Sequence, residues 1–364
     1  MSVSGAKAAV LPSPVHVAAR GVCFDFHPQC GIVSGFAVRD QGRQISMMHA
    51  APWVGSGITL AQDAPPHQAQ LQGDFFCAPF SDASADNAPL HGWPANGLWQ
   101  VSGEAGINQL TCALTQTVMG ATVRKHLSLI DDHPFLYQCH SFTGGQGAMS
   151  AANHAMISLP NGGILRFSRK RRFETPADAP ETDPSRGRSA LRYPASSADP
   201  ASFPAKEGGI VDLTSYPYGP AHEDFVIAVE DENSRLGWTA VTRPVEGDLY
   251  LSLRHPRKLP MTMLWHSNGG RDYAPWNGRH RGCLGVEDGI AWPLLQASGP
   301  YAGQSASVDL APDGVTDVRH VTGCIHWPTG EAVRDVQLAG DCLIVVGDHG
   351  ATRTLPIDGA FLDL

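Results

Sequence analysis

Residues 110–130 read LTCALTQTVMGATVRKHLSLI, two strand-like runs on either side of a single turn. Residues 110–119 and 121–130 are rich in β-branched and apolar side chains, and Gly120 separates them, which predicts an antiparallel hairpin. Residues 32–38 and 44–48 flank a turn at 40–42 and predict a second hairpin. Helical periodicity is hard to find, and further strand-like runs lie at 135–142, 224–229, 249–254, 341–346 and 352–357.

The composition agrees with an all-β chain. Of 364 residues, 39 are Gly and 28 are Pro, while 42% are hydrophobic and only 17% are charged. A coiled coil would be rich in Ala, Glu, Lys and Leu, and a disordered chain would lack this apolar content. Because turns separate short strands at close intervals, the sequence predicts an antiparallel sandwich or barrel and disfavours βαβ units.

One stretch interrupts the strand pattern. Residues 174–209 are dominated by Pro, Ala, Ser and Asp and carry no strand-like run, so they predict a long loop or insertion. Strand-like runs of similar composition resume after it. We therefore expect a single domain over residues 1–364, with one excursion at about 174–209.

Charge and sequence signals argue against several classes of partner. The net charge is −9, and a protein that binds duplex nucleic acid needs a positive surface, so nucleic acid is not an expected partner. No apolar run approaches the roughly 18 residues needed to span a membrane, and no secretion signal is evident. The cysteines include no C-x-x-C pair, so no zinc ribbon or finger is expected. We expect a cytoplasmic protein with reduced thiols.

A histidine lies among tryptophans in the segment 73–99. His91 is followed by Gly92, and Trp93 and Trp99 flank the pair. Aromatic rings pack on the C–H faces of sugars while polar groups bind the hydroxyls, so the segment is typical of a sugar site. The alternative is a turn with buried tryptophans.

Two other segments hold candidates for acid–base chemistry. Asn153 directly precedes His154 and would be placed to orient its ring, although a purely structural histidine is the alternative. Glu287 follows a short apolar run. A carboxyl group in such a setting is either a buried base with a raised pKa or an ion-pair partner of a nearby arginine such as Arg271.

Taken in order, these motifs resemble the aldose 1-epimerase (galactose mutarotase-like) superfamily. The family's His-Gly pair is matched at His91, with Trp99 eight residues later, and its Asn-His pair is matched at 153–154. Its Gly-Val-Glu segment is matched by the run that ends at Glu287. An acidic residue in a strand between the last two motifs has Asp224 as a loose candidate.

The resemblance implies a β-supersandwich of antiparallel sheets that interconverts sugar anomers. His154 would donate a proton to the ring oxygen, and Glu287 would take the proton from the C1 hydroxyl, so that the ring opens and closes again. His91 and Asp224 would bind sugar hydroxyls, and Trp99 would offer an aromatic face. The resemblance implies no metal and no organic cofactor.

The sequence also departs from the family pattern. Many relatives have an arginine four residues after the motif histidine, where this chain has Ala95 followed by Asn96, and an Asn-Arg pair soon after Pro-Phe, where this chain has Ser81-Asp82. Arg271 is a candidate to replace the missing arginines at the substrate.

The expected partner is a small-molecule sugar, bound by a monomer or homodimer. Two alternatives stay open beside the epimerase. One is a non-catalytic carbohydrate-binding module on the same fold, which the missing arginines favour. The other is a polysaccharide lyase or hydrolase, for which Asp224 or Asp288 would serve as the second carboxylate beside Glu287.

Overall fold

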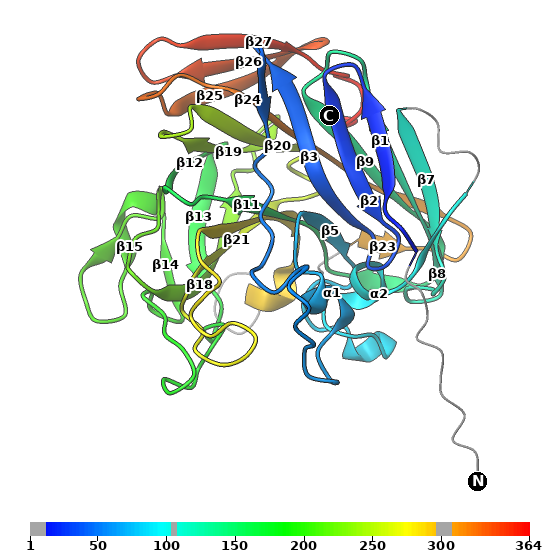
Figure 1. Ribbon diagram of the computed structural model, residues 1–364, viewed down its shortest axis with the longest axis horizontal. Coiled ribbons are helices and arrows are strands. Elements are labelled where there is room, and N and C mark those ends of the chain that lie inside the picture. The colour runs from blue at the N-terminus through cyan, green and yellow to red at the C-terminus, as the bar shows by residue number, and fades with distance from the viewer. Residues whose placement is uncertain (1–11, 103–107, 296–307) are drawn as a thin grey trace.

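The structure is a computed structural model, and it describes residues 12–102, 108–295 and 308–364. The named strands pair antiparallel and form two large sheets, of 11 and 9 strands (Figure 1). In spatial order, the strands of the first sheet are β1 (Val15–Ala19), β2 (Val22–His27), β3 (Ile32–Asp40), β5 (Asp74–Cys77), β11 (Ala151–Ser158), β22 (Cys283–Ile290), β21 (Met261–Asn268), β18 (His222–Glu230), β13 (Lys170–Thr175) and β14 (Ala195–Ser197), with β4 (Arg43–Ile45) beside β3.

The second sheet and the smaller elements complete the described chain. In spatial order, the second sheet contains β17 (Ser215–Tyr216), β12 (Gly163–Phe167), β19 (Gly237–Arg243), β20 (Asp248–Arg254), β24 (Val315–His326), β9 (Phe135–Gly144), β8 (Ala121–Leu129), β7 (Gln109–Leu114) and β6 (Trp99–Val101). The smaller sheets are β25 (Val333–Ala339), β26 (Cys342–Gly347) and β27 (Thr352–Pro356); β10 (Gly147–Met149) and β23 (Val308–Leu310); and β15 (Phe203–Pro204) and β16 (Ile210–Val211). The helices are short: α1 (Pro66–Ala69), α2 (Gly92–Asn96), and the 3-10 turns Ser84–Asp86, Pro200–Ser202 and Trp292–Leu295.

The prediction of an all-β fold is confirmed. The hairpin at 110–130 is formed by β7 and β8, with Gln109 opposite Ser128 and Ala113 opposite Arg124. The hairpin near the N-terminus is formed by β3 and β4. The second strand of that pair, β4, ends at Ile45, whereas the sequence pattern predicted a strand that reaches residue 48.

The large sheets pack face to face around the main apolar core. This core draws Phe24 and Phe76 from the first sheet and Leu127 and Phe142 from the second. A second buried cluster lies between the second sheet and β25–β27, and a third lies on the outer face of the first sheet, under loops and short helices. Figure 1 shows β25–β27 at one end of the molecule and α1 and α2 toward the other.

The central strands of the first sheet are covered on both faces. In β8 buried residues alternate with more accessible ones, whereas β21 and β22 are buried along their whole length. Polar side chains on these central strands are therefore removed from water, which alters their ionisation.

The stretch 174–209 contains more order than its composition suggested. It begins in β13 and includes β14, β15 and a 3-10 turn. The sequence pattern missed these strands because two or three residues are too few to show an alternation. The expectation of a single domain over residues 1–364 stays a prediction.

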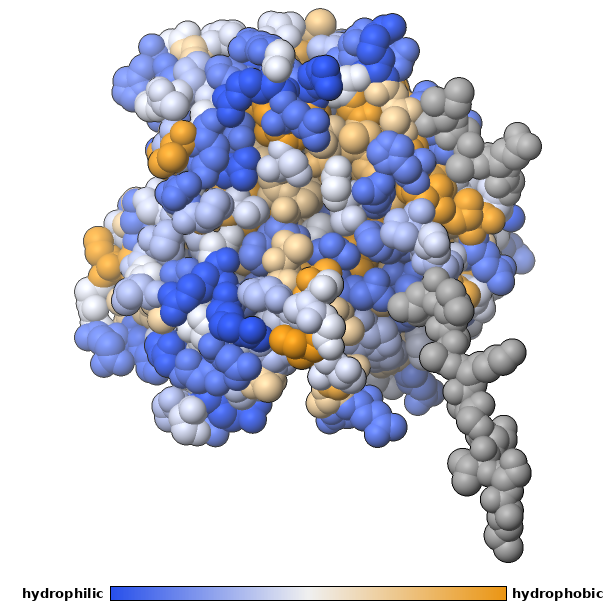
Figure 2. Space-filling model, viewed as in Figure 1, coloured by the Kyte–Doolittle hydropathy of each residue, from blue (hydrophilic) through white to orange (hydrophobic). Residues whose placement is uncertain are grey.

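Hydrophilic side chains dominate the face of the molecule in Figure 2, and the hydrophobic ones form small scattered patches. In the described ranges, none of the helices is both long and apolar enough to cross a membrane.

The core position of Leu127 gives a direct test of this packing. Leu127 is fully buried between the large sheets, so Leu127→Ala is expected to lower the free energy of unfolding by about 2–5 kcal/mol. Val315 is 65% exposed, and Val315→Ala should change the free energy by no more than about 0.5 kcal/mol. Chemical denaturation of both variants measures the difference, and equal effects would contradict the proposed core.

Candidate functional site

A pocket of about 620 Å³ opens on the outer face of the first sheet. Adjacent strands β5, β11, β22, β21 and β18 contribute its floor, and loops supply its walls. Its volume lies within the roughly 300–1,000 Å³ typical of small-molecule sites. The structure brings four of the predicted site residues together here: His91, His154, Arg271 and Glu287.

His154 on β11 and Glu287 on β22 lie side by side on the pocket floor. Nε2 of His154 is 3.2 Å from Oε1 of Glu287. Phe75 stacks on the imidazole of His154, with ring centroids 4.4 Å apart. The two residues are only 4% and 1% exposed. The pair is therefore a close contact that is shielded from water.

Burial controls the ionisation of this pair. It raises the pKa of Glu287 well above the ordinary value for a glutamate. Burial, with a smaller contribution from His67, lowers the pKa of His154 to about 3. Both shifts favour the neutral forms. Burial therefore favours the protonated carboxyl group of Glu287 beside an uncharged imidazole of His154.

Gly285 makes room for the pair. It lies opposite Trp265 of β21, and a Cβ at this position would come within 2.7 Å of Oε1 of Glu287 and 2.9 Å of Cβ of Trp265. Any larger residue would push the Glu287 carboxyl group or the Trp265 side chain out of place.

His91 reaches the pocket from the turn before α2. His91 and Gly92 have φ angles of 69° and 74°, and a Cβ at Gly92 would lie 2.0 Å from the carbonyl oxygen of Ala78. This close approach explains why glycine follows the histidine. The backbone N–H of Ser81 donates to Nδ1 of His91 at 3.3 Å. The neutral ring therefore carries its proton on Nε2, where it can donate.

His67 on α1 also lines the pocket, and the sequence analysis missed it. Its Nδ1 lies 2.9 Å from Oδ1 of Asn96. The amide Nδ2 of Asn96 donates to the carbonyls of Leu90 and Gly92, so its oxygen must face His67 and accept from Nδ1. Nε2 of His67 is left as an acceptor. Asn96, next to the position of the missing family arginine, thus holds a pocket histidine in place.

A tryptophan wall with one arginine forms another side of the pocket. The guanidinium carbon of Arg271 is 4.5 Å from the ring centroid of Trp276, and its Nε is 3.5 Å from Oε1 of Glu223. The indole N–H of Trp265 donates to the same carboxyl oxygen at 2.5 Å. Burial raises the pKa of Glu223, and Arg271 opposes that effect. Arg271 lines the pocket, so its guanidinium group is placed where it could contact a bound substrate.

Asp224 does not lie in the pocket, contrary to the sequence prediction. Its neighbour Phe225 lines the pocket, and side chains alternate along a strand, so Asp224 points to the other side. There it accepts hydrogen bonds from Ser189, from the backbone N–H of Ala190 and from the hydroxyl of Tyr218. Burial alone would raise the pKa of Asp224, but these bonds and His222 lower it below the ordinary value.

Trp99 is also outside the pocket lining, and its side chain cannot offer a face to a ligand there. It is 1% exposed, and its indole N–H donates to the carbonyl of Pro94 at 2.9 Å. The ammonium group of Lys125 lies 5.0 Å from the ring centroid. Trp99 therefore belongs to the core behind α2, the alternative that the sequence analysis had left open.

Asn153 does not orient the His154 ring. Successive residues of β11 face opposite sides of the sheet, and the amide atoms of Asn153 have no hydrogen-bond partner in the described ranges.

The excursion at 174–209 contributes to the pocket wall. Residues Pro176, Ala177, Asp178 and Pro180 line it. The same excursion is tied to the sheet where the backbone N–H of Glu223 donates to the carbonyl of Arg188 at 2.9 Å. A segment without any catalytic pattern therefore shapes the entrance.

Gly92→Ala tests the requirement at the histidine turn. The clash with the Ala78 carbonyl is expected to displace His91 and to cost stability beyond the roughly 1–3 kcal/mol of a strained left-handed residue. Gly57→Ala is the matched control, since its φ of 77° is similar but nothing lies within 4 Å of its Cβ. Thermal unfolding of both variants gives the comparison. Equal losses would contradict the close approach at Gly92.

Asp224→Ala tests the anchoring role. Without its acceptor the excursion should loosen, so limited proteolysis should cut within 174–209 several times faster than in the parent protein. Asp178→Ala is the control on the same excursion, because Asp178 is exposed. An unchanged cleavage pattern in Asp224→Ala would overturn the assignment.

The comparisons with known proteins agree with this architecture. No family model matches the sequence, and no curated protein sequence matches it. Among solved structures, a candidate aldose 1-epimerase from Escherichia coli K12 is similar with a TM-score of 0.57 and 13% identity, covering 86% of this chain and 98% of its own. A galactose mutarotase related enzyme from Lactobacillus acidophilus gives a TM-score of 0.52 at 12% identity, with 87% of this chain and 98% of its own covered.

A third similar structure, a candidate aldose 1-epimerase from Klebsiella pneumoniae, has a TM-score of 0.53 and 14% identity, covering 84% of this chain and 77% of its own. At such low sequence identities the similarity shows the fold alone. The resemblance drawn from the sequence motifs is confirmed at that level. The chain has the galactose mutarotase-like fold, a β-supersandwich of antiparallel sheets.

Proposed function

We propose that this protein is a sugar 1-epimerase, which interconverts the anomers of a free aldose by opening and closing its ring. The observation that carries the proposal is the contact between His154 and Glu287, 3.2 Å apart on the floor of a pocket of suitable size. Ring opening needs one proton donor and one proton acceptor at the hemiacetal, and the pair supplies both.

The shared proton fits this reaction. Ring opening delivers a proton to the ring oxygen and removes one from the C1 hydroxyl, so the number of protons on the enzyme does not change. In the family's assignment His154 is the donor and Glu287 the acceptor. In the free protein burial leaves the proton on Glu287, and its transfer across the contact to His154 restores that assignment.

After C1 rotates, the same two transfers run backwards and close the ring on the other face. The pair then returns to its starting state. Either tautomer of the one-proton pair contains one donor and one acceptor, so no second acid is required.

The remaining pocket residues suit a polyol. The N–H at Nε2 of His91 and the free Nε2 of His67 offer one donor and one acceptor for hydroxyl groups. Arg271 adds a cationic donor, and Trp265 and Trp276 present rings for the C–H faces of a sugar. These groups replace the shell of arginines that the sequence lacks.

A hydrolase with two facing carboxylates is a poorer match to the pocket. Asp224 points away, and Asp288 is held by Arg254 and His320 on the other face of β22. Neither of the two acids considered as partners of Glu287 can reach the pocket floor.

Removal of either member of the pair should strongly reduce catalysis without unfolding the protein. We expect His154→Gln and Glu287→Gln each to reduce the rate of anomer exchange by about 10²–10⁴-fold, because each removes one proton-transfer group. Saturation-transfer NMR with a panel of free aldoses measures the exchange. His126→Gln is the control, since this half-buried histidine bonds to Thr111 in the second sheet.

Three outcomes separate the readings. Loss of exchange in both pair variants with activity retained in His126→Gln supports the proposal. Sugar-dependent tryptophan fluorescence without exchange in the parent protein would replace it with a carbohydrate-binding module. Release of reducing ends from an oligosaccharide would favour a lyase or hydrolase.

The pH profile tests the one-proton pair. As pH falls, His154 becomes protonated only near its lowered pKa of about 3. As pH rises, Glu287 loses its proton when the pH passes its raised pKa. The exchange rate should therefore show no acid limb near the ordinary histidine pKa of about 6.5, and it should fall as pH rises through the raised pKa of Glu287. An acid limb centred near the ordinary histidine value would contradict this assignment.

A further inference from the structure

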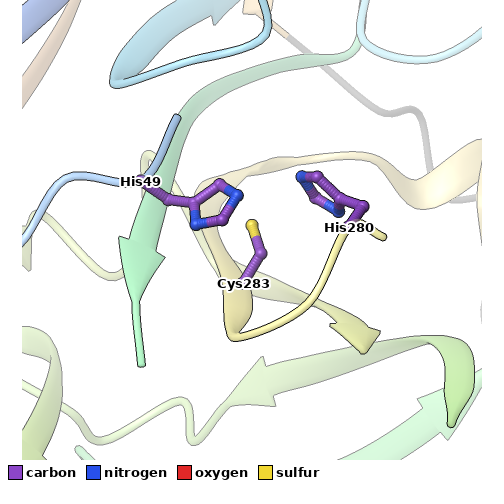
Figure 3. Close-up of side chains that lie close together, drawn as sticks. All are labelled: His49, His280 and Cys283. Atoms are coloured by element: carbon purple, nitrogen blue, oxygen red, sulfur yellow. The ribbon is translucent and has the colours of Figure 1, made fainter. Parts of the chain in front are cut away.

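His49, His280 and Cys283 lie together in the interior and are here called the His49–His280–Cys283 cluster. One ligand atom from each side chain lies within 4.8 Å of the others. Figure 3 shows both imidazole rings and the thiol directed toward a common point. His280 and Cys283 are 1% and 0% exposed, and His49 is 9% exposed.

The two imidazoles each keep an unpaired nitrogen in this space. Nε2 of His49 and Nε2 of His280 have no hydrogen-bond partner in the described ranges. A buried polar atom without a partner costs free energy, and native proteins satisfy nearly all of them. What distinguishes these two nitrogens from other unpartnered imidazole nitrogens of the structure is the thiol of Cys283 beside them, which completes a set of three metal-binding donors.

Hydrogen bonds behind His280 prepare its Nε2 for such a role. The hydroxyl of Ser267 donates to Oε2 of Glu223 at 2.8 Å, so it accepts from Nδ1 of His280 at 2.7 Å. The proton of the neutral ring is therefore on Nδ1, and the lone pair is on Nε2. Metal-bound histidines are typically held in this way by an outer hydrogen bond.

The local backbone brings the donors together. His280 and Cys283 form an H-x-x-C pair around Gly282, whose φ of 64° turns the chain. His49 comes from a distant segment, and its backbone N–H and C=O bond to Met156 and Gly73, at 2.9 and 2.8 Å. Both sides of the cluster are thus fixed by main-chain contacts.

We propose that the His49–His280–Cys283 cluster is a binding site for one cation of the zinc type, bound by one thiolate and two imidazole nitrogens. Zinc accepts this donor set at about 2.0–2.3 Å, with a fourth position that a water can fill. The three ligand atoms, which lie within 4.8 Å of one another, would move closer together around a bound ion. Binding replaces the thiol proton, which leaves to solvent, and satisfies both orphan nitrogens.

The site would act behind the pocket wall and not in the acid–base chemistry. The ring of His280 stacks on Trp265, with centroids 5.3 Å apart and an interplanar angle of 18°. A cation that fixes His280 therefore also fixes the aromatic wall. This makes His280 a positioning residue for Trp265.

Metal binding by the whole chain gives the test. Protein stripped of metal with a chelator is titrated with Zn²⁺, followed by calorimetry and elemental analysis, and with Co²⁺ as a spectroscopic probe. We expect one equivalent of either ion and a thiolate-to-cobalt charge-transfer band. Cys283→Ser should lose the band and the binding. Ser267→Ala should weaken binding by about 10–100-fold, because it removes the outer partner of a ligand.

Cys324→Ser is the matched control, as this buried cysteine lies on β24 in the second sheet with its thiol on the carbonyl of Ile45. It should keep the full stoichiometry. Absence of stoichiometric binding or of the charge-transfer band in the parent protein overturns the proposal, and so does binding that survives in Cys283→Ser. The parent titration decides the matter even if that variant does not fold. No sugar enters these measurements, so they are independent of the proposed epimerase.

Discussion

The pairing of β11 with β22 is the constraint on which the site depends. Ala152 lies opposite Gly289 and Ala155 opposite Val286, and this register puts His154 opposite Glu287. Side chains facing each other across neighbouring strands have Cβ atoms about 4.5–5.5 Å apart, so an imidazole and a carboxyl group in that position must meet. A slip of one residue would turn His154 to the far side of the sheet.

Burial of His154 and Glu287 determines the direction in which the pKa of each group is shifted. Strands of the first sheet are covered by the second sheet on one face and by loops on the other, so the pair has little water to stabilise charge. Burial therefore favours the uncharged forms of both the acid and the base. The sandwich that places the two groups also determines their ionisation.

The sequence pattern revealed most of the strands and the two residues that meet on the pocket floor, but it did not show which face of a strand each side chain occupies. The hairpin at 110–130 and the motif residues His91, His154 and Glu287 were found because local pattern and short motifs carry them. Asp224 was predicted to bind the substrate, but its neighbour Glu223 is the residue that contacts the pocket wall. Adjacent acidic residues in one strand point to opposite faces of the sheet, and the sequence pattern does not show which face carries the pocket. His67 was missed because a lone histidine in a proline-rich turn carries no motif.

The excursion at 174–209 forms part of the pocket wall, whereas the residues proposed for the chemistry lie on other segments of the chain. Its wall residues come from a segment fastened to the sheet by Asp224 and Arg188, while the reacting pair stands on strands of the sheet itself. Under the proposed function, exchange of that segment would alter which sugars enter the pocket and leave His154 and Glu287 in place. For the proposed epimerase, substrate range and reaction type could therefore change independently.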